Sequence, residues 1–224
     1  IPSHVRFLSG FRCTGLEEVI IDEGVETIGE ACFSGCASLE SLTIPESVRK
    51  ISSSAFGDCA SLRMLKLPKN MEILENEVFR GCSKLERIDI PEGVTKIPSK
   101  LFSGCTSAHV HLSSTVREFV STGDMASMSV SSANEVLAME SDCLIDKRKR
   151  ELLHVLPHAT AFPENLKSIN LPSDFFPPLL DREELVIPEG VTHISSLPFR
   201  RMSKLKKLVL PATMQSLGYS FWRE

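Results

Sequence analysis

This sequence of 224 residues lacks several features that mark particular protein classes. No apolar run approaches the roughly 20 residues of a membrane-spanning helix. The formal net charge of −4 gives no general attraction to nucleic acid or to anionic membranes. With 42% hydrophobic and 24% charged residues, the composition nevertheless matches a folded, soluble chain. The chain opens at Ile1 without Met or a secretory signal, and we interpret it as a slice of a longer polypeptide.

Motifs of common enzyme classes are also missing. The sequence contains no nucleophile elbow, phosphate-binding glycine loop, Cys-x-x-Cys pair or His-Glu-x-x-His helix. Cys143 and His154 are a conceivable nucleophile and base, but the sequence shows no third group that would orient the base. We therefore predict a non-catalytic protein without a metal or cofactor, and keep a hydrolase using these two residues as an alternative.

One pattern is abundant instead. Cys36, Cys59, Cys82 and Cys105 each follow a Phe by three residues and lie 23 residues apart, and Cys13 lies another 23 residues before Cys36. Three windows superpose at every apolar position. They run from Val25 to Pro45, from Val48 to Pro68 and from Met71 to Pro91. A period of this length indicates a solenoid, because one such unit cannot bury its own apolar face and must stack on its neighbours.

Each unit divides into distinct pieces. Leu39-x-x-Leu42-x-Ile44 ends with the two-residue spacing of a strand, and Pro45 then removes a backbone donor and ends the strand. Val48 and Ile51 are too close together for more than a bend or bridge. The apolar residues of Ala55–Cys59 are spaced by three and four, which predicts a short helical turn on the outer side.

The pattern L-x-x-L-x-L…V-x-x-I…F-x-x-C-x-x-L resembles a leucine-rich repeat. IPEGVTKI at Ile90–Ile97 and IPEGVTHI at Ile187–Ile194 resemble the BspA-like class, which occurs on bacterial and protozoan surface proteins. The resemblance covers residues 1–112 and 183–211. It implies a right-handed solenoid with one parallel β-sheet on the concave face and short helical turns outside.

The cysteine row has three interpretations. Cysteine stands where common leucine-rich repeats have an apolar residue, and free cysteine behaves as a small buried hydrophobe. Met202 takes the equivalent position after Phe199, which speaks against an obligatory disulfide or metal ligand. Stacked coils bring the Cα atoms within bridging range, but their Cβ atoms point the same way. We favour reduced, buried thiols over disulfides or a metal, and expect Cys32 and Cys143, outside the row, as candidates for exposure.

The pattern is interrupted after Cys105. We predict three parts of one continuous solenoid: residues 1–112 as an array of 23-residue units, 113–160 as an irregular insert, and 161–224 as further repeats with an end cap. Within the insert, residues 143–145 and 152–156 are expected to form a β-hairpin with a charged tip. Gly218–Trp222 holds the only Tyr and the only Trp and is either the cap or a stub of a longer array.

Alternate residues of the repeated strands should project outward and form a binding surface. We predict as partner-binding residues Ser41, Thr43, Met64, Lys66, Arg87, Asp89, His109 and His111. Glu18 and Ile20 precede them at the equivalent positions. Residues 147–150 form a basic cluster that we interpret as a solvated turn at the hairpin tip. A second basic cluster, residues 200–207, straddles a helical turn and a strand, so only Lys207 is expected on the concave sheet.

The sequence and its resemblance together predict a protein-recognition or adhesion module. A rigid solenoid sheet suits the binding of another macromolecule. The resemblance implies a secreted or cell-surface location and a protein partner, such as a host extracellular-matrix or cell-surface protein. A cytoplasmic interaction scaffold is the alternative, because free thiols and the lack of a signal peptide also fit that compartment.

Overall fold

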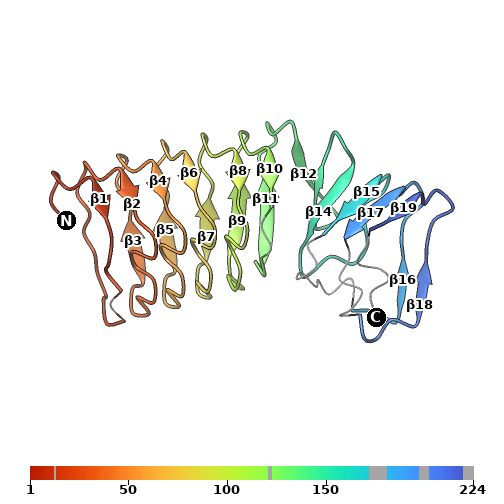
Figure 1. The fold of residues 1–224 in the computed structure, drawn as a ribbon, viewed down its shortest axis with the longest axis horizontal. Helices are drawn as coiled ribbons and strands as arrows, with labels where there is room; N and C mark the ends of the chain where they lie inside the picture. The colour runs from red at the N-terminus through yellow and green to blue at the C-terminus, as the bar shows by residue number, and fades with distance from the viewer. Residues whose placement is uncertain (13, 121–122, 172–180, 197–201, 219–224) are drawn as a thin grey trace. The chain divides into compact units, whose positions relative to one another are not determined.

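The chain forms two compact units, Ile1–Asn134 and Glu135–Glu224. The computed structural model describes all residues except 13, 121–122, 172–180, 197–201 and 219–224. In the first unit successive coils stack side by side in a row (Figure 1). Cys13, Phe199 and most of the expected end cap at Gly218–Trp222 lie outside the described residues.

The main sheet of the first unit has five parallel strands in the order β11-β9-β7-β5-β3. Its strands are β3 (Ser41–Thr43), β5 (Met64–Lys66), β7 (Arg87–Asp89), β9 (His109–Leu112) and β11 (Ser127–Val130). β11 pairs with β9 in parallel, with Met128 opposite Val110. The parallel sheet therefore continues past residue 112. The three-part division predicted from the sequence stays a prediction.

A second set of short parallel strands lies in the same coils, where the sequence predicts no more than a bend or bridge. β1 (Phe7–Leu8), β2 (Thr27–Ile28), β4 (Lys50–Ile51) and β6 (Ile73–Leu74) form one sheet, and β8 (Lys96–Ile97) pairs with β10 (Glu118–Phe119). The prediction of a single sheet was wrong in this respect. Two residues per coil suffice for a strand here because each coil offers hydrogen-bond partners to the next.

No helix occurs in the residues that the structure describes, so the predicted helical turns were wrong. The backbone of Ser54–Asp58 shows why. The N–H groups of Ser54, Phe56 and Asp58 donate to carbonyls of the next coil, those of Asn76, Val78 and Arg80. A helix needs these donors for its own carbonyls. Backbone hydrogen bonds thus join successive coils at these turns as well as in the sheets.

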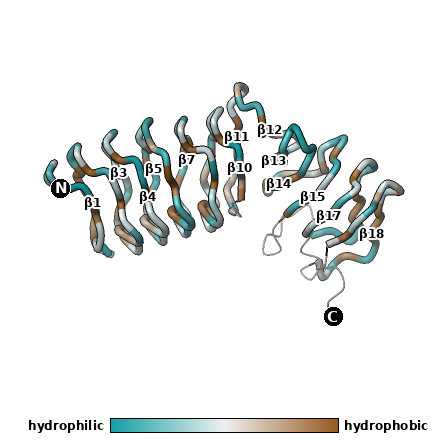
Figure 2. The backbone as a smooth tube through the Cα atoms, turned by 45° about the horizontal axis from the view of Figure 1, so that its top comes forward, coloured by the Kyte–Doolittle hydropathy of each residue, from teal (hydrophilic) through white to brown (hydrophobic). Residues whose placement is uncertain are grey.

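The core of the first unit is a column of identical side chains at the repeat period. Phe33, Phe56, Phe79 and Phe102 are fully buried, and neighbouring rings stack with centroids 5.5 to 6.1 Å apart. Each fully buried Phe contributes about 1.5–3 kcal/mol by removal from water. In Figure 2, hydrophobic and hydrophilic stretches alternate along each coil, as this arrangement requires.

The cysteines of the row pack beside this column. Cys36, Cys59, Cys82 and Cys105 are buried and free. The thiol of Cys105 donates to the carbonyl oxygen of Phe79 at 3.0 Å, and the other three make the equivalent bond, 25 or 26 residues back. Cys32 and Cys143 are also buried and free, so the expectation that they are candidates for exposure was wrong.

The glutamate of the I-D-E and I-P-E turns links one coil to the next. Glu23 accepts hydrogen bonds from the backbone N–H groups of Glu46 and Ser47, at 3.1 and 3.0 Å. Glu46 accepts from Lys69 N–H at 2.8 Å, and Glu92 from Ser114 N–H at 3.2 Å. At these three turns, backbone donors are therefore satisfied by a carboxylate of the preceding coil.

The second unit holds a six-stranded sheet in the order β12-β13-β14-β15-β17-β19 and a parallel pair, β16-β18. The strands are β12 (Leu137–Glu140), β13 (Cys143–Asp146), β14 (Glu151–Val155), β15 (Ser168–Asn170), β16 (Glu184–Val186), β17 (His193–Ser196), β18 (Lys207–Val209) and β19 (Ser216–Leu217). β12, β13 and β14 pair antiparallel, and the sheet is parallel from β14 onward. Met202 is buried in the core of this unit.

Candidate binding face

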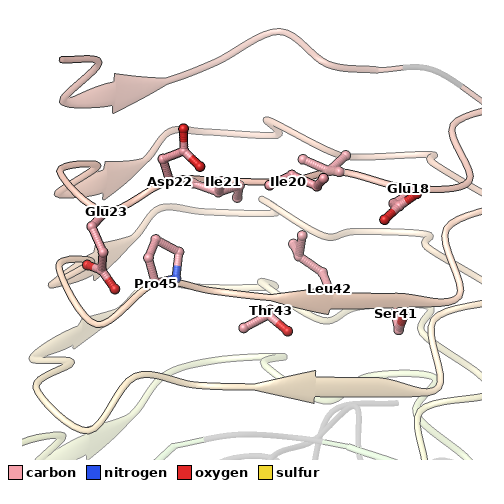
Figure 3. A pocket seen from close by; sticks show the side chains of 10 residues that line it. Glu18, Ile20, Ile21, Asp22, Glu23, Ser41, Leu42, Thr43 and Pro45 are labelled. Carbon is pink, nitrogen blue, oxygen red and sulfur yellow. The ribbon is translucent and has the colours of Figure 1, made fainter. Parts of the chain in front are cut away.

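The candidate site is the solvent-facing side of the five-stranded sheet, called here the outward face. It is formed by Ser41, Thr43, Met64, Lys66, Arg87, Asp89, His109, His111, Ser127 and Ser129. The central residue of each strand, such as Leu42 or Leu65, is buried between them. In Figure 3, Ser41 and Thr43 point to one side of β3 and Leu42 to the other.

The strand register places these residues in two rows. Met64 pairs with Ser41 on one side and with Arg87 on the other, and His109 and Ser127 continue the row. In the second row Thr43 lies beside Lys66, and His111 lies between Asp89 and Ser129. All eight residues predicted from the sequence are thus brought together on one surface.

Ser127 and Ser129 belong to the same surface and were missed from the sequence. A signal existed: Met125-x-x-Met128-x-Val130 repeats the spacing of Leu39-x-x-Leu42-x-Ile44 with Met at the Leu positions. Met125 and Met128 are buried, as that pattern requires.

The face is hollowed between β3, β5 and β7. The groove encloses about 610 Å³ and is lined by Thr43, Met64, Lys66 and Arg87 among others. Met64 is 64% exposed. Beyond β3, Figure 3 shows Glu18–Glu23 alongside the strand, where Glu18, Ile20, Ser41 and Thr43 line a second hollow. The face therefore offers apolar and polar groups side by side.

Charges on the face are partly neutralised within it. Arg87 and Asp89 form an exposed ion pair along β7, with Nη2 and Oδ1 2.8 Å apart. This pair raises the pKa of the Arg87 guanidinium. Within the described part of the chain, Lys66 forms no such ion pair. Lys66 is thus available to an acidic group of another molecule.

Described residues of the two basic clusters pair with nearby carboxylates. Lys204, Lys206 and Lys207 pair with Asp181, Glu183 and Glu184 of the preceding coil, at 2.6 to 2.8 Å. At the hairpin tip, Arg150 forms a bidentate pair with Glu140, at 2.8 and 2.9 Å. These paired residues differ from the open cationic surface that nucleic acid binding requires.

The geometry of Cys143 and His154 does not support a catalytic pair. Cys143 lies opposite Val155, and His154 opposite Leu144, so the two side chains project from opposite faces of the hairpin. Burial raises the pKa of the Cys143 thiol to about 12 and lowers the pKa of His154 to about 3. The reactive thiolate is therefore disfavoured at neutral pH.

The described part of the chain holds no group of three His, Cys, Asp or Glu side chains arranged to bind a metal ion. None of its residues forms a helix with the length and apolarity needed to span a lipid bilayer.

The family assignment follows from a match to the repeats themselves. A profile of the BspA type leucine rich repeat region matches residues 9–123 and 169–224, in six copies. The chain belongs to the BspA-type leucine-rich repeat family. The resemblance inferred from the sequence is thereby confirmed.

The solved structures to which this chain is similar include a bacterial leucine-rich repeat protein. A leucine-rich repeat protein from Eubacterium ventriosum aligns with a TM-score of 0.68 and 20% identity, over 88% of this chain and 61% of the other. The pneumococcal vaccine antigen PcpA aligns with a TM-score of 0.48 and 20% identity, over 86% of this chain and 44% of the other. This BspA-type chain thus spans less than two thirds of either protein. At 20% identity, the likeness to the Eubacterium ventriosum protein shows the fold alone. No curated protein matches the sequence.

Proposed function

We propose that the chain is a non-catalytic recognition or adhesion module that binds a protein partner through the outward face. The observation that carries this proposal is the face itself. Its side chains change from rung to rung, from Met64 to Arg87 to His109, over a rigid stack of buried leucines and isoleucines. A rigid surface with exposed apolar and charged groups side by side suits protein recognition.

The same proposal includes the position of the outward face in the solenoid, the location of the protein and the kind of partner. We take the outward face to be the concave side of the solenoid, and the chain to be part of a secreted or surface-exposed protein with a host matrix or cell-surface protein as partner. Membership of the BspA-type family supports this location, and leucine-rich repeat proteins are generally non-catalytic. The opposed faces of Cys143 and His154 give no support to the hydrolase alternative.

A charge reversal of the groove tests the proposal. Lys66→Glu, Arg87→Glu and Asp89→Lys are combined, and capture of partners from host matrix and cell-surface extracts is compared with wild type. Because all three side chains are exposed, thermal stability should change little, by about 0.5 kcal/mol or less per site. Capture by the variant should fall at least about tenfold.

A matched control carries Glu30→Lys and Lys84→Glu, two exposed charges outside the outward face. It should capture the same proteins as wild type. Capture that survives the groove variant but is lost in Arg148→Glu with Lys149→Glu would move the site to the hairpin tip, where both side chains are exposed.

A further inference from the structure

A chain of four side chains crosses the outward face between β9 and β11. His109 Nδ1 lies 2.8 Å from Ser127 Oγ, and His109 Nε2 lies 3.0 Å from Ser129 Oγ. The same Ser129 oxygen lies 2.9 Å from His111 Nδ1. Both imidazoles are only half-buried, so their protonation changes the charge that a partner meets. We call these four residues the His–Ser chain.

Each serine hydroxyl has a single hydrogen, which limits how the hydrogen bonds of the His–Ser chain can be arranged. A neutral imidazole has one donor and one acceptor nitrogen. When both rings are neutral, Ser129 can donate to one ring and accept from the other, and such a chain runs in one of two directions. When His109 gains a proton, both of its nitrogens donate, so Ser129 can only accept from His109 and its hydroxyl hydrogen is free to point toward a neutral His111. Protonation of one ring therefore changes the hydrogen bonds open to the other.

The charged groups around the His–Ser chain come from β7. Arg87 lies opposite His109 and Asp89 opposite His111, while β11 contributes only the two uncharged serines. Burial, together with the positive charges of Arg87 and of a protonated His111, lowers the pKa of His109, and Asp89 opposes this. At neutral pH the opposite charges of Arg87 and Asp89 cancel. At lower pH, each proton that His109 or His111 binds leaves this part of the face with a net positive charge.

We infer that the His–Ser chain makes this end of the outward face pH-dependent, so that acidification turns it from a neutral into a cationic surface that favours an acidic protein segment. This inference rests on the proposed function, since it describes how partner binding at the same face is regulated. The chemistry is simple: neutral imidazoles leave Arg87 paired with Asp89, and imidazolium groups add charge that carboxylates of a partner complement.

The first test needs no partner. The ring protons of His109 are followed by NMR across the acidic range at low salt. Arg87→Gln removes a positive charge and should raise the apparent pKa of His109 by a few tenths of a unit, whereas Asp89→Asn should lower it. Both shifts should shrink at high salt. A titration of His109 that is the same in both variants would overturn the inference.

The second test uses a short peptide of glutamates as the probe. Wild type should bind it at least about threefold more tightly at about pH 5 than at about pH 7.5. His109→Gln with His111→Gln should abolish this difference. His4→Gln with His158→Gln, two exposed histidines outside the outward face, should keep it. Equal binding at both pH values in wild type would overturn the inference.

The two proposals can fail separately. Binding of the glutamate peptide that depends on pH, together with natural partners that are captured equally by wild type and the groove variant, would overturn the proposed function. Partner capture lost in the groove variant, with no pH effect on the peptide, would overturn the inference alone.

Discussion

The thiol of Cys82 donates a hydrogen bond to the backbone carbonyl oxygen of Phe56, 3.1 Å away in the preceding coil. The same carbonyl accepts the N–H of Cys59, at 3.3 Å, from its own coil. Both lone pairs of a buried carbonyl are thereby used. Repeated along the row, this bond explains why a cysteine suits a position that other leucine-rich repeats fill with an apolar residue: it packs as a small hydrophobe and joins neighbouring coils.

The first prediction concerns thiol reactivity. Burial raises the pKa of Cys32, Cys59, Cys105 and Cys143 to about 12, and that of Cys82 further. Little thiolate exists at about pH 8, and none of it is accessible. Labelling of native protein with a thiol reagent should therefore leave these cysteines unmodified, and denaturant should release them. Rapid labelling of any of them in folded protein, seen by peptide mapping, would contradict the account.

The second prediction tests the hydrogen bond from Cys82. Cys82→Ala removes a buried donor and leaves a small cavity, and should lower the free energy of unfolding by about 1–3 kcal/mol in urea denaturation. Lys84→Ala, an exposed change two residues away, should be within about 0.5 kcal/mol of wild type. Cys59→Asp should be far worse than either, because it buries a charge without a partner. Equal effects of Cys82→Ala and Lys84→Ala would show that the thiol contributes nothing.

Much of the first unit follows from the sequence because each apolar position repeats in register. The burial of Phe33, Cys36, Leu39 and Leu42 and the outward direction of Ser41 all follow from the period and from the alternation of a strand. The outer turns do not. The spacing of Ala55–Cys59 suits a helix, but donors such as Phe56 N–H reach the neighbouring coil, and no single unit reveals that competition.

The His–Ser chain shows a second limit. His109 and His111 were predicted to face outward, and they do. Their partners Ser127 and Ser129 stand only 18 residues after them, a coil five residues shorter than the 23-residue period. Methionines replace leucines in that coil. Because the spacing is shorter and methionines replace leucines, the coil that contains β11 was not recognised as a repeat from the sequence. The parallel pairing of β11 with β9 shows that it is one.

The third prediction concerns the glutamates that link the coils. Glu23→Ala removes the acceptor for two backbone N–H groups and should lower the free energy of unfolding by about 1 kcal/mol. Glu40→Ala removes an exposed glutamate side chain that carries no such bonds, and should change it by less than about 0.5 kcal/mol. Chemical denaturation of both variants gives the comparison. A Glu40 variant as unstable as the Glu23 variant would mean that charge alone, rather than the bonds, matters.

The fourth prediction concerns acid stability. Burial lowers the pKa of His154 to about 3, from 6.5 when unfolded. Below pH 6.5 the unfolded chain therefore binds more protons at His154 than the folded chain does. The contribution of His154 to the free energy of unfolding is fully present above pH 6.5 and is lost as the pH falls toward 3. His154→Leu should remove about 2 kcal/mol of the loss between about pH 7 and pH 5, measured by urea denaturation. The exposed His158→Leu should leave the loss unchanged. If the free energy of unfolding of His154→Leu depends on pH as it does in wild type, the lowered pKa of His154 is not the cause of the acid sensitivity.

The most direct measurement of the central claim is site-specific photocrosslinking. A benzophenone amino acid replaces Met64, on the outward face, or Ile73, an equally apolar side chain on the second sheet that is 47% exposed. Both proteins are illuminated with host matrix and cell-surface extracts, and the adducts are identified by mass spectrometry. The account predicts a protein adduct from position 64 that is absent from position 73. An adduct from position 73 with none from position 64 would contradict it.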